Sequence, residues 1–90
     1  MDPANLIHMA NRIGEFFAAL PDRDEAREGV ATHLSRYWAP RMRRQIFAQL
    51  DRGEADEMSA LVREALVAYR VKLEPDDPFR AGPTRRDRRD

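Results

Sequence analysis

The feature that most constrains this chain is the spacing of its apolar residues, which recur three or four positions apart in four separate runs. Such spacing is typical of helices that bury one face. The runs are separated by residues at which helices commonly begin or end, namely Pro3, Pro21, Pro40 and Gly53. The sequence therefore predicts an all-α fold, a small bundle of three to four short helices. We expect the first two helices to pack antiparallel through Pro21, with a further helical pair behind them.

The first two predicted helices follow Asp2 and Asp22, whose side chains can cap a helix N-terminus. The apolar stripe of the first comprises Leu6, Met9, Ala10, Ile13, Phe16, Phe17 and Leu20. The stripe of the second comprises Ala26, Val30, Leu34 and Tyr37. His33 lies within that second stripe, and we expect it to be a packed, hydrogen-bonded side chain rather than a metal ligand. His8 projects from the polar side of its helix and is expected at the surface.

The third predicted helix begins at Pro40, and the fourth runs from about Asp56 to Arg70. Their apolar faces comprise Met42, Ile46, Phe47 and Leu50 in the third, and Met58, Leu61, Val62, Ala65, Leu66 and Tyr69 in the fourth. The last seventeen residues contain three prolines and blocks of charge, a composition that cannot form a core. We therefore predict a helical domain over residues 1–73 and an extended or disordered tail over residues 74–90.

Composition excludes several classes of function. The chain has no cysteine, which excludes disulfides, thiolate metal sites and cysteine nucleophiles. Its two serines, Ser35 and Ser59, have no histidine and aspartate at a spacing that suggests a catalytic triad, and there is no glycine-rich phosphate loop. We expect no catalytic, cofactor-binding or metal site. The start of the chain is acidic and no apolar run reaches membrane-spanning length, which predicts a cytoplasmic protein that contacts no membrane.

Three arginines break the usual pattern at the start of the third predicted helix. Arg41, Arg43 and Arg44 face the positive end of the helix dipole, which lowers the stability of the helix by about 0.3–1 kcal/mol for each exposed cation. Arg43 also falls inside the apolar arc of the helix. Aromatic and arginine side chains commonly anchor protein interfaces, so we interpret this turn as a docking site. The predicted interface comprises Tyr37, Trp38, Pro40, Arg41, Met42, Arg43 and Arg44, with Phe79 as an anchor in the tail. The alternative is that Trp38 belongs to the core and the arginines extend from a packed helix edge.

The most specific strings of the chain lie in its first half. They are Met9-Ala10-Asn11, Ile13-Gly14 leading to Phe16-Phe17, and Trp38-Ala39-Pro40-Arg41-Met42-Arg43. With the surrounding residues, roughly 5–50, these strings resemble the delta subunit of the cytoplasmic, NAD-dependent formate dehydrogenases that contain molybdenum or tungsten. Arg12 departs from that family, whose pattern often shows glutamine there.

The resemblance implies a non-catalytic accessory subunit that docks on the large catalytic subunit and, through it, joins the NADH-side subunits. It also implies a role in assembly, cofactor loading or stability of the complex. The cofactors expected on the partner subunits are bis-molybdopterin guanine dinucleotide with molybdenum or tungsten, iron–sulfur clusters and FMN. None is expected on this chain.

Two other classes of function fit part of the sequence. One is a small nucleic-acid-binding module, with residues 22–52 as a helix-turn-helix whose arginines contact phosphates. Sixteen basic and sixteen acidic residues give zero net charge, which argues against nucleic acid as a partner. The other is a free-standing chaperone that leaves after cofactor insertion, and it differs from a subunit only in how long it stays bound.

Overall fold

The computed structural model describes residues 2–75, which fold into five helices and contain no strand. The helices are α1 (Pro3–Phe17), α2 (Arg23–Tyr37), α3 (Pro40–Asp51), α4 (Ala60–Ala68) and α5 (Arg70–Leu73). The predicted all-α class is confirmed, with α5 as one additional turn of helix. The predicted tail falls almost entirely outside the described residues.

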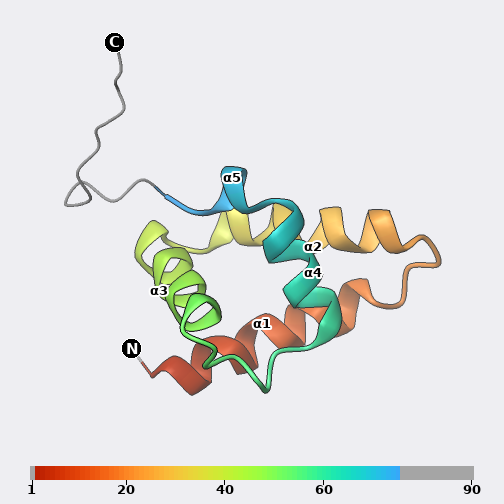
Figure 1. Cartoon of the computed structure of the whole chain (residues 1–90). Helices are drawn as coiled ribbons and strands as arrows, with labels where there is room; N and C mark the ends of the chain where they lie inside the picture. The colour runs from red at the N-terminus through yellow and green to blue at the C-terminus, as the bar shows by residue number, and fades with distance from the viewer. Residues whose placement is uncertain (1, 76–90) are drawn as a thin grey trace, which may run out of the picture.

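The helices are arranged around the antiparallel pair α1 and α2, which is joined at one end by the turn at Pro21 (Figure 1). At the other end of this pair, α3 packs mainly against α1. In contrast, α4 packs against both α2 and α1, and α5 returns to α2. The third and fourth helices therefore do not form the second pair that the sequence suggested, because each finds its main apolar partner on the first hairpin.

Side-chain caps explain where the first two helices begin. The Asp2 carboxylate accepts a hydrogen bond from the backbone N–H of Ala4 at 3.0 Å, and Asp22 accepts one from Asp24 at 2.9 Å. These bonds satisfy amide groups that have no partner within the helix, so both predicted caps are confirmed.

The end of α3 is marked by Gly53, whose φ of 72° lies in the left-handed region that favours glycine. The N–H groups of Gly53 and Glu54 donate to the carbonyls of Leu50 and Gln49, at 3.2 and 2.9 Å. This pair of bonds is the Schellman arrangement that commonly ends a helix. The helix end expected at Gly53 is confirmed.

The fourth helix begins at Ala60, four residues after the predicted start at Asp56. Ser59 is its cap, since the hydroxyl oxygen accepts from the Val62 N–H at 3.3 Å. The preceding connection is held by Asn11 of α1, whose side-chain amide donates to the Glu57 carbonyl and whose amide oxygen accepts from the Ser59 N–H, both at 2.8 Å. Apolar spacing cannot distinguish this anchored turn from a helix because Met58 is buried in either case.

The core is drawn from all five helices and from the connection before α4. Its largest fully buried apolar side chains are Phe47, Leu6, Leu34, Ile46, Leu66 and Leu73. Close approach of α1 to α4 depends on Gly14, because a Cβ at that position would lie 2.8 Å from Cγ2 of Val62. Asn11 and Gly14, both in the strings singled out above, therefore position α4 on α1.

Candidate docking surface

The predicted interface residues occupy different environments. Tyr37 is 70% exposed, and Pro40 and Arg41 are also exposed. Met42, Arg43 and Arg44 are half-buried, whereas Trp38 is only 6% exposed and belongs to the core. Phe79 lies outside the described residues. Of the predicted set, the exposed members are therefore the ones that a partner can reach directly.

Arg43 forms hydrogen bonds within the chain. Its Nη1 donates to the carbonyl oxygen of Leu73 at 2.9 Å, and its Nε reaches the carbonyl oxygen of Trp38 at 3.4 Å. The guanidinium therefore joins the last residue of α5 to the residue that ends α2, where helices leave carbonyl groups without partners. Trp38 therefore belongs to the core, and Arg43 extends from the edge of a packed helix. This is the alternative to a docking role that the sequence had left open for these two residues.

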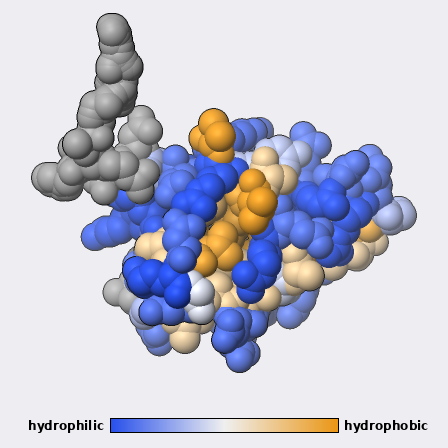
Figure 2. Space-filling view, viewed as in Figure 1, coloured by the Kyte–Doolittle hydropathy of each residue, from blue (hydrophilic) through white to orange (hydrophobic). Residues whose placement is uncertain are grey.

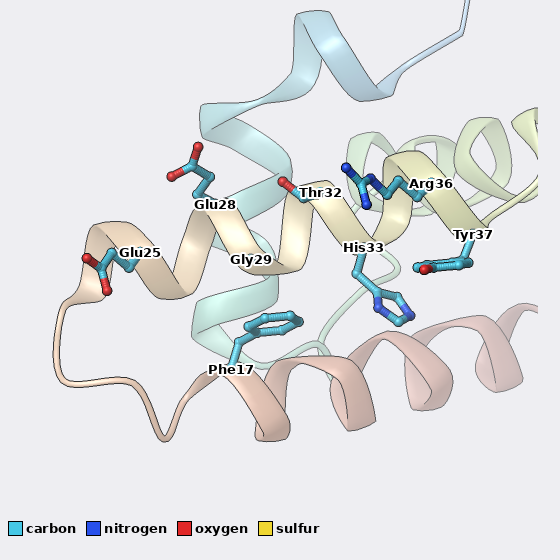
Figure 3. A pocket seen from close by; sticks show the side chains of 8 residues that line it. All are labelled: Phe17, Glu25, Glu28, Gly29, Thr32, His33, Arg36 and Tyr37. Atoms are coloured by element: carbon cyan, nitrogen blue, oxygen red, sulfur yellow. The ribbon is translucent and has the colours of Figure 1, made fainter.

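An apolar groove between α1 and α2 was missed by sequence reasoning. It has a volume of about 540 Å³ and is lined by Arg12, Ile13, Phe16, Phe17, His33 and Tyr37. An adjoining hollow of about 380 Å³ lies along α2 and shares the side chains of Phe17, His33 and Tyr37 (Figure 3). We call the two together the aromatic groove.

The aromatic rings of the groove form a continuous row. Ring centroids are 5.0 Å apart for Phe16 and Phe17, 6.5 Å for Phe17 and His33, and 4.8 Å for His33 and Tyr37. Phe16 is 75% exposed, so the row is open to solvent at Phe16 and Tyr37. His33 is packed as expected, although no hydrogen bond to its side chain is found among residues 2–75.

The shape of the groove depends on Gly29. Figure 3 shows the Phe17 ring lying against α2 at this glycine, and a Cβ there would be only 2.3 Å from Cδ1 of Phe17. A glycine inside a helix lowers helix stability by about 1 kcal/mol relative to alanine, so it usually has a packing reason. That unexplained glycine was the sequence signal that could have indicated the groove.

Charged side chains of opposite sign lie at the two ends of the aromatic groove. Glu25 and Glu28 lie toward one end and Arg36 beside Tyr37 at the other, as Figure 3 shows. Because α1 runs antiparallel to α2, Arg12 lies on the Tyr37 side, one turn before Phe16. Within residues 2–75, none of these four side chains forms an ion pair or a hydrogen bond.

Other charged side chains are engaged in ion pairs. Glu64 of α4 accepts from Arg23 at 2.9 and 3.0 Å and from Arg27 at 3.0 Å, and these bonds lower the pKa of its carboxyl group to about 2. Arg27 also pairs with Asp24.

A second set of ion pairs fixes α5. Arg70 pairs with Asp51 and with Glu74, at 2.6 Å in each case, while its guanidinium lies 4.9 Å from the centre of the Phe47 ring. These contacts tie α5 to the end of α3. Arg23, Arg27 and Arg70 therefore hold helices together through ion pairs. Arg12 and Arg36 in the groove have no such role within residues 2–75.

A second apolar patch lies over α4 and α5, on the face that Figure 2 presents. Val67 is 65% exposed and Val71 fully exposed. Since α4 packs onto the α1–α2 pair from one side and the aromatic groove opens between the same helices, this patch and the groove lie on different faces.

The arrangement of α2 and α3 does not favour the helix-turn-helix alternative. The main partners of α2 are α4 and α1, and α3 packs chiefly on α1. In the helix-turn-helix alternative Arg43 would contact a phosphate, but here it donates hydrogen bonds to backbone carbonyls.

The fold and the aromatic groove define the class of this protein: a small all-α chain with an open row of aromatic rings, which has arginines at one end and glutamates at the other. Residues 2–75 contain no group of three or more histidine, cysteine, aspartate or glutamate side chains that could hold a metal ion. No helix in that part of the chain is both long and apolar enough to cross a membrane. The family model for the NADH-dependent formate dehydrogenase delta subunit, FdsD, matches residues 5–66, and the chain belongs to this family.

The match confirms the resemblance seen in the sequence. It covers α2, α3 and most of α1 and α4, and thus extends beyond the strings that indicated the family. No curated protein and no solved structure matches the chain.

Proposed function

We propose that this chain is a non-catalytic accessory subunit that docks on the large, molybdenum-cofactor-bearing subunit of an NAD-dependent formate dehydrogenase. In this role it supports assembly, cofactor loading or stability of that subunit. The observation that carries the proposal is the family match over residues 5–66. The exposed aromatic and arginine side chains supply the kind of surface that docking needs.

In this proposal, the chemistry resides on other subunits. Bis-molybdopterin guanine dinucleotide with molybdenum or tungsten, iron–sulfur clusters and FMN are carried by the large subunit and the NADH-side subunits, in the cytoplasm. This chain has no cysteine to ligate a cluster. It needs neither nucleic acid nor a membrane to act.

Docking alone can support the partner. A chain that binds only the folded, cofactor-loaded form stabilises that form by mass action, by about 2.7 kcal/mol when its free concentration is a hundred times its dissociation constant. No group of this chain has to approach the reacting atoms.

We propose that the docking surface includes the exposed part of the predicted turn, Tyr37, Pro40 and Arg41, with Met42 and Arg44 beside it. Trp38 and Arg43 support this turn from inside. Phe79 would add a contact from the tail.

The proposal is tested by deleting the chain in its native host and purifying the formate dehydrogenase. We expect lower molybdenum or tungsten content per complex, measured by elemental analysis, and a lower melting temperature of the large subunit. Native mass spectrometry of the wild-type complex distinguishes a stoichiometric subunit from a transient chaperone. If deletion left subunit composition, metal content and melting temperature unchanged, the proposed function would be wrong.

Variants of the turn need care because some of its residues hold the fold together. Arg43→Glu with Trp38→Ala would remove a core side chain and two helix-end bonds, so lost co-purification would not indicate a lost contact. Tyr37→Ala with Arg41→Glu changes exposed side chains only. We expect this variant to fold normally and to co-purify less.

A further inference from the structure

We propose that the aromatic groove receives a segment of a partner polypeptide in one orientation. An apolar side chain of that segment would pack against Phe16 and Tyr37. A carboxylate would lie at the Arg12 and Arg36 end, and a basic side chain at the end marked by Glu25 and Glu28. This inference rests on the proposed function, because it names the surface and the chemistry through which the accessory subunit would dock.

The apolar part of the argument is the exposure of large rings. Phe16 and Tyr37 are 75% and 70% exposed, although the other large apolar side chains of α1 and α2 are buried or half-buried. Each aromatic ring covered by a partner removes a large apolar area from water. The ring row is also preformed, because Gly29 and His33 seat Phe17 on α2. A preformed surface lowers the entropy that binding must overcome.

The polarity of the groove gives the orientation. Arg12 and Arg36 lack partners within residues 2–75, and so do Glu25 and Glu28 at the other end. The neighbouring cations Arg23 and Arg27 are occupied by Glu64. A partner segment with the opposite order of charges would be favoured, and the reverse order would place like charges together.

The shape of the groove favours a different polypeptide over a second copy of this chain. Two copies related by a two-fold axis present the same patch to each other. They would bring two hollows of about 540 Å³ face to face, which leaves the aromatic rings incompletely covered. A convex segment carrying one apolar side chain fills the hollow instead.

The test measures binding of the full chain to formate dehydrogenase purified from a deletion strain, by biolayer interferometry at low and high salt. We expect Phe16→Ala with Tyr37→Ala to weaken binding about thirtyfold, a typical loss for interface anchors. We expect Arg12→Glu with Arg36→Glu to weaken it about tenfold at low salt and less at high salt. The control is Val67→Ala with Val71→Ala on the other face, which should bind like wild type.

A charge-swapped variant tests the orientation itself. Arg12→Glu and Arg36→Glu combined with Glu25→Arg and Glu28→Arg keep the net charge but reverse the polarity. We expect this variant to remain weak, because it then matches the wrong order of charges. Wild-type affinity would overturn the proposed orientation.

The outcomes separate this inference from the proposed function. If the wild-type chain binds and the aromatic pair variant binds equally well, the groove is not the docking site, although docking stands. If the wild-type chain does not bind at all, the proposed function itself fails. A stable homodimer in analytical ultracentrifugation that the Phe16 and Tyr37 changes dissolve would replace the partner segment by a second copy. Circular dichroism melts of each variant confirm that its fold is retained.

Discussion

At the residue scale, Gly14 shows how one missing side chain sets the distance between two helices. We predict that Gly14→Ala lowers the free energy of unfolding by up to about 2 kcal/mol. The introduced Cβ meets the buried Val62, and such overpacking costs about 1–3 kcal/mol, whereas alanine gains only about 1 kcal/mol in helix propensity. Urea unfolding followed by circular dichroism measures the change.

The matched control removes the clash from the other side. Val62→Ala deletes the methyl group that the new Cβ would meet, so in this background Gly14→Ala should be neutral or stabilising. Equal destabilisation in both backgrounds would show that Gly14 is required for a reason other than its approach to Val62.

Individual residues also show where the sequence could not decide. Arg43 is placed correctly within the apolar arc of α3, but its partners, the Trp38 and Leu73 carbonyls, belong to helix ends whose positions depend on the whole fold. The position of Trp38 at the edge of the apolar stripe is compatible with either an interface or the core. The structure buries its side chain in the core. Of the predicted docking residues, the structure therefore leaves the exposed members, Tyr37, Pro40 and Arg41, as candidates for direct contact with a partner.

At the element scale, α2 and α4 are joined by the ion pairs of Glu64 with Arg23 and Arg27. The pKa of Glu64 is lowered from 4.5 to about 2 in the folded chain. Because the pKa of Glu64 is lower in the folded chain, its ion pairs stabilise the fold fully above pH 4.5. This contribution to the free energy of unfolding is lost as the pH falls toward 2. We predict that Glu64→Gln lowers the urea midpoint at pH 7, and that the difference from wild type shrinks below pH 4.5.

The effect should be modest and sensitive to salt because the Glu64 side chain is 38% exposed. Glu15→Gln provides the control, since Glu15 is exposed and has no side-chain partner within residues 2–75. A difference between Glu64→Gln and wild type that persisted unchanged at pH 2 would rule out the ion pairs as its source.

Element positions were predictable where local chemistry sets them. The caps at Asp2 and Asp22 and the glycine after α3 depend on neighbouring residues only, and the structure has each in the expected place. The predicted start of α4 was wrong because the true start depends on a hydrogen bond from the Ser59 N–H to Asn11, which lies 48 residues earlier in the chain. The aromatic groove was missed for the same reason, since it requires the packing distance between α1 and α2.

At the scale of the whole molecule, a chain of this length buries only about 60% of its unfolded surface, and here two large aromatic side chains remain exposed. We predict a free energy of unfolding of about 3–5 kcal/mol for the isolated chain. Addition of formate dehydrogenase from a deletion strain should raise its melting temperature, as hydrogen exchange or labelled-chain fluorescence can measure. A monomer that melted cooperatively at high temperature without a partner would contradict this expectation.

The side-chain bridge from Asn11 to the connection before α4 has a consequence for the order of folding. Helices α1 and α2 can meet through a short turn, but the amide of Asn11 must find backbone groups 46 and 48 residues away. Contacts so distant in sequence close large loops and slow the search for the native state. On a ribosome, the first hairpin would emerge well before Ser59, so α4, with α5 after it, arrives late in synthesis on a surface already formed to receive it.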